Sequence, residues 1–213
     1  MKVGVLGSGD VAKALAAGFL KYKYEVTMGT RDISKLADFA HAHPGIRVGS
    51  FADAAQFGEV LVLAVKGGAA VDVLNAAGPA NLKGKTVLDP TNAIAEVPPV
   101  NGVIQAFTAA NESLMGRLQK QFPDANFVKA FSCVGSDSMV DPKFKGGQPT
   151  MFIAGDNAAA RKTATSICEQ FGWEVADMGT AEAARAIEPL AILWCIPGFL
   201  QNDWGPRAFK LLR

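Results

Sequence analysis

Residues 1–20 read MKVGVLGSGDVAKALAAGFL, and they predict a strand, a glycine turn and a helix in direct succession. Val3, Val5 and Leu6 form a short apolar run typical of a buried strand, and apolar residues from Val11 onward recur at helical spacing. The turn between them, residues 7–12, has the pattern G-x-G-x-x-A. This order of elements is the context in which such a turn binds a dinucleotide.

The small residues of this turn meet three different steric demands. Gly7 permits the tight turn, Gly9 lets the backbone approach a pyrophosphate, and Ala12 lets the helix pack close to the strand. The helix N-terminus adds partial positive charge and free N–H donors. A plain strand-to-helix turn is the alternative, because glycine turns are common. The context favours nucleotide binding. We therefore predict that the cofactor is bound by Gly7, Ser8, Gly9, Asp10, Val11 and Ala12.

Composition narrows the class of protein. The 213 residues are 49% hydrophobic and 19% charged, as expected for a globular α/β protein. The net charge of +1 gives no reason to expect nucleic acid or an anionic membrane as partner. No uninterrupted apolar run approaches the roughly 20 residues that span a bilayer, and the first residues predict a strand rather than a signal peptide. We expect small molecules as partners.

Cysteine and histidine usage predicts a reducing compartment and no metal site. Cys133, Cys168 and Cys195 are odd in number and lack metal-like spacing, so we expect a cytoplasmic protein without disulfides. His41 and His43 could in principle ligate a metal, but no third ligand lies near them in the sequence. They fit the end of a helix, where imidazolium complements the helix dipole.

The end of the second predicted strand, residues 25–28, decides which dinucleotide is favoured. An acidic residue there would bind the ribose 2′-OH of NAD, whereas an arginine accommodates the 2′-phosphate of NADP. In this sequence Thr30 and Arg31 follow the strand before any acidic residue, and the first acidic residue is Asp32. Lys35 lies about one helical turn after Arg31. The pattern predicts NADP(H). In the alternative interpretation Asp32 caps the next helix and Arg31 is a solvated surface charge.

The following 100 residues predict a Rossmann-type doubly wound, mainly parallel α/β sheet. Further strands are expected at residues 46–49, 59–65, 85–89 and 126–131, with helices at 33–42, 50–55, 69–77 and 111–122. Ligands bind beyond the carboxyl ends of such strands, which adds Val65, Lys66 and Asn92 to the cofactor site. A solvated lysine and an Asx turn after Pro90 are the alternatives for Lys66 and Asn92.

The rhythm of the chain changes after residue 135. We therefore predict an NADP(H)-binding domain at 1–135 and a smaller C-terminal α/β unit at 136–213. The smaller unit has expected strands at 149–155 and 173–179 and a helix at 157–171 that Asp156 caps. A last helix from residue 180 is interrupted by Pro189 and ends at residues 197–198.

Two stretches predict contacts beyond the cofactor. The last helix is too apolar for a lone surface element, so it is either buried in its own subunit or packed against a partner, and we expect a homodimer. Residues 93–108 are irregular, and a loop of this length suggests a cover for the site or a subunit contact.

With these residues in hand, the sequence resembles the NADP-dependent coenzyme F420 oxidoreductase family. The stretches that carry the resemblance are residues 7–12, 29–31, 128–131, 151–156 and 182–191. It implies a Rossmann domain that binds NADPH, a small C-terminal domain that covers the nicotinamide and helps to form a dimer, and hydride exchange with a deazaflavin stacked on the nicotinamide. The NADPH-binding domain of membrane ferric reductases is similar to this fold.

Two features depart from the family pattern. Ser132 follows the Lys-Ala-Phe stretch, where the family often has asparagine. Residues 93–108 form a longer segment than expected for F420 enzymes, and such a segment could reshape the deazaflavin pocket.

Hydride transfer between stacked rings needs the reacting carbons about 3–3.5 Å apart and water excluded, but little side-chain chemistry. We accordingly predict no catalytic side chain, and interpret Lys66 and Lys129 as ordinary strand-end lysines rather than proton donors. The expected acceptor is F420, FMN or FAD; a non-catalytic NADPH-binding module, either a redox sensor or a structural subunit, is the alternative. Walls for the second substrate are expected at Ser132, Cys133, Val134, Trp194 and Pro197. Cys133 has no base to activate it and is interpreted as a buried thiol.

Overall fold

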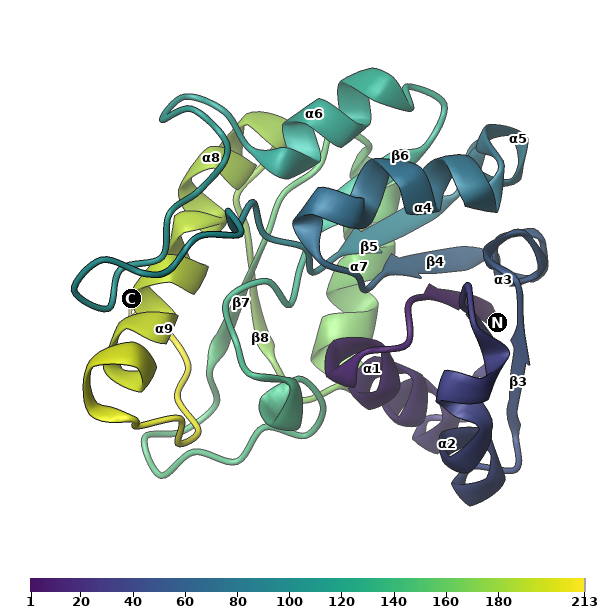
Figure 1. Cartoon of the computed structure of the whole chain (residues 1–213), viewed down its shortest axis with the longest axis horizontal. Coiled ribbons are helices and arrows are strands. Elements are labelled where there is room, and N and C mark those ends of the chain that lie inside the picture. The colour runs from purple at the N-terminus through teal and green to yellow at the C-terminus, as the bar shows by residue number, and fades with distance from the viewer. Residues whose placement is uncertain (213) are drawn as a thin grey trace.

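A six-stranded parallel sheet lies at the centre of the computed structural model, which describes residues 1–212 (Figure 1). Its strand order, β3-β2-β1-β4-β5-β6, is that of the Rossmann fold and confirms the predicted fold class. The strands are β1 Lys2–Leu6, β2 Glu25–Gly29, β3 Ile46–Gly49, β4 Val60–Leu63, β5 Thr86–Asp89 and β6 Asn126–Lys129.

Helices cover both faces of this sheet, and Figure 1 shows α4 and α6 above it and α1 below. One apolar cluster joins the sheet to α1 and α7, and the other joins it to α3, α4 and α6. The helices within the first 135 residues are α1 Asp10–Lys21, η1 Ile33–Leu36, α2 Ala37–Ala42, α3 Phe51–Phe57, η2 Gly67–Ala69, α4 Ala70–Ala77, α5 Pro79–Leu82 and α6 Leu114–Gln121.

Strand β4 shows why a strand of this sheet is apolar at every position. Val60 and Val62 pack into the cluster on the α1 face, whereas Leu61 and Leu63 pack into the cluster on the opposite face. A strand covered on both sides has no solvent-facing positions, so the alternation of apolar and polar residues is lost. Burying each of these side chains contributes about 1.5–3 kcal/mol.

The C-terminal part adds a second, two-stranded parallel sheet. It consists of β7 Thr150–Ile153 and β8 Glu174–Asp177, joined by α7 Ala158–Gln170, with η3 Ser136–Ser138 before them. Lys129 at the end of β6 forms an antiparallel bridge with Ala154 just beyond β7. The division of the chain between residues 135 and 136 stays a prediction.

The predicted cap of α7 was wrong by one residue. The Asn157 side chain accepts a hydrogen bond from the backbone N–H of Ala160 at 3.0 Å and caps the helix. The Asp156 carboxylate instead accepts from the backbone N–H of Ala181 at 2.9 Å. Both residue types are good caps, and a contact made 25 residues along the chain decides between them.

The predicted end of the last helix was also wrong. After η4 Ala181–Ala183 and α8 Ala184–Ile187, the helix α9 runs Pro189–Gln201 with Pro197 inside it, and it ends where Asn202 adopts a left-handed conformation at φ 52°. Gly198 is a packing position rather than a stop, since a side chain there would overlap the Trp204 ring.

One helical stretch, Ala181–Gln201, is long and apolar enough to cross a membrane by length and composition alone, with a mean hydropathy of 1.4. Its Glu188 carboxylate is buried in the protein against Lys129 and α6. Core helices of globular proteins meet the same length and composition criteria, so the stretch is weak evidence for a membrane span.

Between β5 and α6 the chain forms a long loop that lies against α9. Two isolated antiparallel bridges, Ile94 to Ala106 and Val100 to Val103, shape it into a narrow hairpin. At its tip Gly102 lies so close to Leu200 that a side chain there would overlap the leucine. The loop therefore borders the same end of the molecule as α9, on the left of Figure 1.

Candidate functional site

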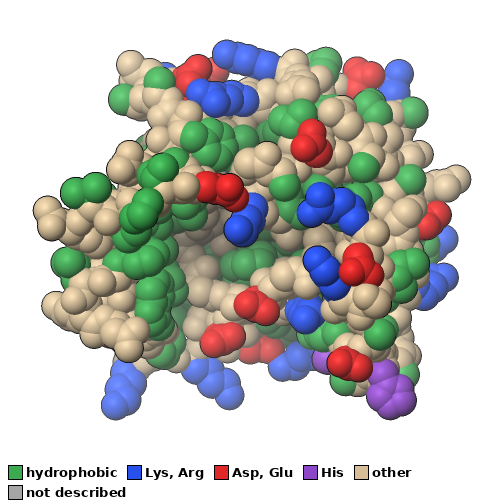
Figure 2. Space-filling view, viewed as in Figure 1, with side chains coloured by type: hydrophobic (Ala, Val, Ile, Leu, Met, Phe, Trp, Pro, Cys, Tyr) green, Lys and Arg blue, Asp and Glu red, His purple; other side chains and the backbone are tan. Residues whose placement is uncertain are grey.

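A cavity of about 460 Å³ opens at the carboxyl ends of β1, β2 and β4, above the N-terminus of α1. In Figure 2, lysine and arginine side chains gather to the right of the central hollow, and an apolar band borders it on the left. The cavity brings together these predicted cofactor residues: Gly7, Ser8, Gly9, Asp10, Val11, Thr30, Arg31, Lys35, Val65 and Lys66. Phe51, Ala64, Val73 and Pro90 are among its other lining residues, which the sequence patterns did not single out.

The two glycines of the turn have different structural requirements. Gly7 has φ 142°, and a Cβ there would overlap the backbone carbonyl oxygen of Ala64. Only glycine fits this position. Gly9 has open space where a side chain would lie, so its backbone is accessible from the cavity.

The N-terminus of α1 is left open, in contrast to those of α3, α6 and α7. Ser50, Ser113 and Asn157 each cap their helix with a side-chain oxygen, whereas Gly9 gives the 12-residue helix α1 no side-chain cap. The first N–H groups of a helix need acceptors, and a phosphate supplies them together with a charge that suits the helix dipole. This end of the cavity therefore fits a pyrophosphate.

Beyond β2 the acidic residue is already engaged. The Asp32 carboxylate accepts hydrogen bonds from the Ser34 hydroxyl at 2.6 Å and the Ser34 N–H at 3.0 Å, which caps η1 and lowers the pKa of Asp32. Arg31 is exposed and forms no ion pair with any residue in the described part of the chain. Thr30 is buried beside it, with its hydroxyl 3.2 Å from the Asp32 backbone. A free guanidinium next to an occupied carboxylate suits a 2′-phosphate.

Two predicted cofactor residues lie outside this cavity's lining. Ala12 is buried beneath Gly7 and acts through packing. Asn92 lines a smaller cavity of about 110 Å³ between the loop and the α8–α9 segment, and its side-chain N–H donates to the Ser132 carbonyl at 2.7 Å. Lys66 lines the main cavity with its side chain exposed, 3.9 Å from Glu96 of the loop.

The residues predicted for the second substrate partly come together. Ser132, Cys133 and Val134 form a buried turn, and the Trp194 ring packs against Gly135, which follows it. Pro197 lies nearly one helical turn further along α9. Burial raises the pKa of the Cys133 thiol to about 12, so the thiol stays protonated and is not a nucleophile at neutral pH.

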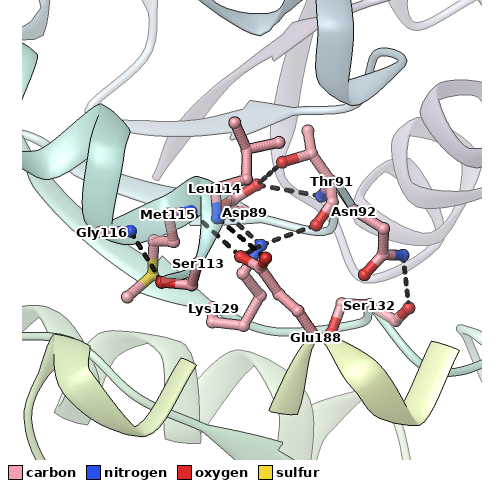
Figure 3. Close-up of polar contacts among 10 residues, drawn as sticks. All are labelled: Asp89, Thr91, Asn92, Ser113, Leu114, Met115, Gly116, Lys129, Ser132 and Glu188. Carbon is pink, nitrogen blue, oxygen red and sulfur yellow. Dashed lines mark hydrogen bonds and ion pairs between the residues drawn. The ribbon is translucent and has the colours of Figure 1, made fainter. Parts of the chain in front are cut away.

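A buried cluster of charged side chains lies beside this turn (Figure 3), and the sequence patterns did not predict it. The fully buried Lys129 ammonium lies 2.8 Å from Asp89 Oδ2 and 3.0 Å from Glu188 Oε1, and it donates to the Thr91 carbonyl at 2.6 Å. Burial lowers the pKa of Lys129, but the two facing carboxylates outweigh this effect and the net shift is upward. The interpretation of Lys129 as an ordinary strand-end lysine was therefore wrong.

The sequence did carry a signal for this cluster. Lys129 and Glu188 are lone charges within the apolar stretches 127–131 and 187–191. Charged residues are rarely buried unless they are paired. The sequence did not show that Lys129 and Glu188 are partners, because only the fold brings residues 59 positions apart into contact.

Comparison with known proteins places these features in a family. Residues 2–93 match the family model described as NADP oxidoreductase, coenzyme F420-dependent. Among curated proteins, metalloreductase STEAP3 of Rattus norvegicus is 28% identical over 205 residues, or 93% of this chain and 39% of that protein. Metalloreductase STEAP2 of Homo sapiens is 27% identical over 89% of this chain and 36% of its own length. The chain thus spans less than two fifths of the length of these relatives.

Two solved structures match most or all of the chain. An imine reductase of Streptomyces aurantiacus is 18% identical with a TM-score of 0.66 over 94% of this chain and 63% of its own, a likeness of fold alone. A crystal structure described as a candidate F420-dependent NADP-reductase from Arthrobacter sp. FB24 is 31% identical, with a TM-score of 0.92 over 100% of both chains. The chain belongs to the coenzyme F420-dependent NADP oxidoreductase family.

Proposed function

We propose that this chain is an oxidoreductase that exchanges a hydride between NADPH and a flavin-like acceptor, either coenzyme F420 or FMN or FAD, stacked on the nicotinamide. The observation that carries the proposal is the cavity in which an uncapped helix N-terminus meets the free guanidinium of Arg31. Membership of an NADP-dependent oxidoreductase family supports the same assignment.

Each part of the cavity has a distinct task in this proposal. The backbone around Gly9 and the first turn of α1 hold the pyrophosphate, and Arg31 and Lys35 hold the 2′-phosphate. NADPH supplies the hydride. The protein orients the rings and excludes water. Lys129 is paired with buried carboxylates inside the protein and is not proposed as a general acid.

We place the acceptor beside the 132–134 turn, with Trp194 as one wall. The 110 Å³ cavity at Asn92 is well below the roughly 300 Å³ at which ligand pockets begin, so a tricyclic ring does not fit inside it. The acceptor is therefore proposed to stack in the open cleft in front of α9, where Figure 2 shows the apolar band.

An acceptor screen tests the proposal. Purified protein with NADPH is offered F420, FMN, FAD and ferric chelates, and NADPH oxidation is followed; we expect turnover with F420 or a flavin. NADPH binding without turnover of any acceptor would contradict the proposal that the chain is an enzyme, and would support a non-catalytic NADPH-binding module. Knowing whether the source organism makes F420 decides between the deazaflavin and the flavins.

We further propose a homodimer that buries the exposed apolar face of α9. Phe199 and Leu200 are 46% and 56% exposed, and Val100 and Val103 on the adjoining hairpin are 59% and 43% exposed. Because the hairpin tip packs on Leu200, these side chains form one patch. Analytical ultracentrifugation measures the oligomeric state. We expect the parent protein to be a dimer and Leu200→Asp to be a monomer, and a monomeric parent protein would refute the proposed dimer.

We propose a cytoplasmic location, and the three free cysteines are in keeping with it.

A further inference from the structure

The Lys129 cluster joins two parts of the molecule, and hydride transfer makes no direct use of it. Figure 3 shows the ammonium between the end of β5, which carries Asp89, and the Glu188 side chain that enters from the α8–α9 junction. An ammonium has three N–H donors, and here three oxygens lie within 3.0 Å. The ammonium donates to Thr91 and its charge is paired with two carboxylates, so Lys129 acts on its neighbours and not on a ligand.

On one side the cluster fixes the turn after β5. The Thr91 carbonyl accepts from Lys129 at 2.6 Å, and Asp89 Oδ1 accepts from the Thr91 N–H at 2.9 Å and from its hydroxyl at 2.6 Å. Thr91 is thus bound through its carbonyl, its amide and its hydroxyl. The next residue is Asn92, so the position of its side chain follows from this turn.

Three buried side-chain oxygens in this region have no hydrogen-bond partner among the described residues: Asp89 Oδ2, Asn92 Oδ1 and Ser132 Oγ. Asp89 Oδ2 is paired with the Lys129 ammonium, whereas Asn92 Oδ1 and Ser132 Oγ have no such ion pair. Such atoms cost free energy unless a ligand or water satisfies them. They belong to the ends of β5 and β6, where the nicotinamide half of a bound dinucleotide is expected. A carboxamide offers an NH2 group, whose N–H can donate to the Asn92 amide oxygen, and a carbonyl oxygen, which can accept from the Ser132 hydroxyl.

On the other side the cluster fixes α9. Besides facing Lys129, the Glu188 carboxylate accepts from the backbone N–H groups of Leu114 at 2.8 Å and Met115 at 3.0 Å, the first residues of α6. Glu188 directly precedes Pro189, where α9 begins. The start of the helix that carries Trp194 is therefore tied to the same ammonium as the Asn92 turn.

We propose that Lys129 is a positioning residue. Through Thr91 it holds Asn92 and Ser132 in place to bind the nicotinamide carboxamide, and through Glu188 it holds α9 beside this binding site. The inference rests on the proposed NADPH binding and not on the identity of the acceptor.

The test compares two ligands on the full chain. NADPH has the nicotinamide, whereas 2′,5′-ADP has the adenosine and the 2′-phosphate without it. For Lys129→Met and for Asn92→Ala we expect the Kd of NADPH to rise about tenfold while that of 2′,5′-ADP stays within about twofold. Lys83→Met, which removes an exposed lysine 4.0 Å from Asp124, is the matched control and changes neither Kd.

A merely structural role would give a different pattern. Equal changes in the Kd of both ligands, or no change in either, would overturn the inference. If Lys129→Met does not fold, Glu188→Gln keeps the contacts of Lys129 with Asp89 and Thr91. It should raise the Kd of NADPH selectively by about threefold, and an unselective effect overturns the inference as well. Parent protein that binds neither ligand would overturn the proposed function itself, whatever the variants do.

Discussion

Arg31→Ala should change the protein from an NADPH binder to one that scarcely distinguishes NADPH from NADH. Arg31 is exposed and unpaired in the described chain, so its removal breaks no contact within the protein. Surface substitutions of this kind shift the free energy of unfolding by about 0.5 kcal/mol or less. Any large effect on binding therefore reports the contact with the ligand.

The size of the effect follows from that contact. A hydrogen bond to a charged group contributes about 1.5–3 kcal/mol, and the solvent around Arg31 favours the lower half of the range. At 1.4 kcal/mol per factor of ten, the Kd of NADPH should rise about 10- to 40-fold, and that of NADH by less than about threefold. Lys35→Ala should give a smaller selective loss, because an ammonium makes a point contact where the guanidinium makes two.

Titration of each variant with NADPH and NADH at one fixed ionic strength measures this selectivity. Arg47→Ala removes another exposed arginine, 3.4 Å from Glu25 and outside the cavity lining, and should leave both affinities unchanged. Equal losses of NADPH and NADH in Arg31→Ala would refute the assignment of Arg31 to the 2′-phosphate. They would show that Arg31 contacts a part of the ligand that both dinucleotides share.

Three further predictions concern stability and reactivity. Gly7→Ala should lower the free energy of unfolding by about 2–3 kcal/mol, since it adds a side chain at φ 142° against a backbone carbonyl, and calorimetry measures it; an unchanged Tm would contradict the turn geometry. Cys195, which is only half-buried, should be alkylated by iodoacetamide well before Cys133, whose pKa is raised to about 12; mass spectrometry gives the order, and the reverse order would count against the burial. Hydrogen bonds from Lys21 and Tyr22 lower the pKa of Asp141, so its stabilising contribution is present above the unfolded pKa near 3.8 and is lost as the pH falls through the folded value. The Tm of Asp141→Asn should accordingly fall less between pH 6 and pH 3 than that of the parent protein, and parallel curves would exclude the effect.

Local patterns predicted the sheet well. The glycine turn and the apolar run of β4 each have a cause within a few residues, and the structure has both elements where the sequence indicated them. The NADP preference inferred from Arg31 and Asp32 is of the same local kind, and the capping role of Asp32 is present in the structure.

Non-local contacts account for what the sequence did not predict. Asp and Asn have similar propensities as helix N-caps. Asp156 accepts a hydrogen bond from the Ala181 N–H, and Asn157 caps α7 instead. Pro197 satisfies the local rule for a helix end, yet α9 continues past it to Gln201. Lys129 was interpreted as an ordinary strand-end lysine because its two carboxylates lie 40 and 59 residues away in the chain.

The packing of α7 on the sheet has a consequence for biosynthesis. The ring of Phe19 in α1 lies 5.0 Å from that of Phe171, and the Tyr24 hydroxyl donates to Gln170 at 2.6 Å. The ribosome delivers the partners of these residues only about 150 residues after the residues themselves. Until then the Phe19 and Tyr24 rings lack these partners, and a chaperone that binds exposed aromatic rings would compete with folding during that interval.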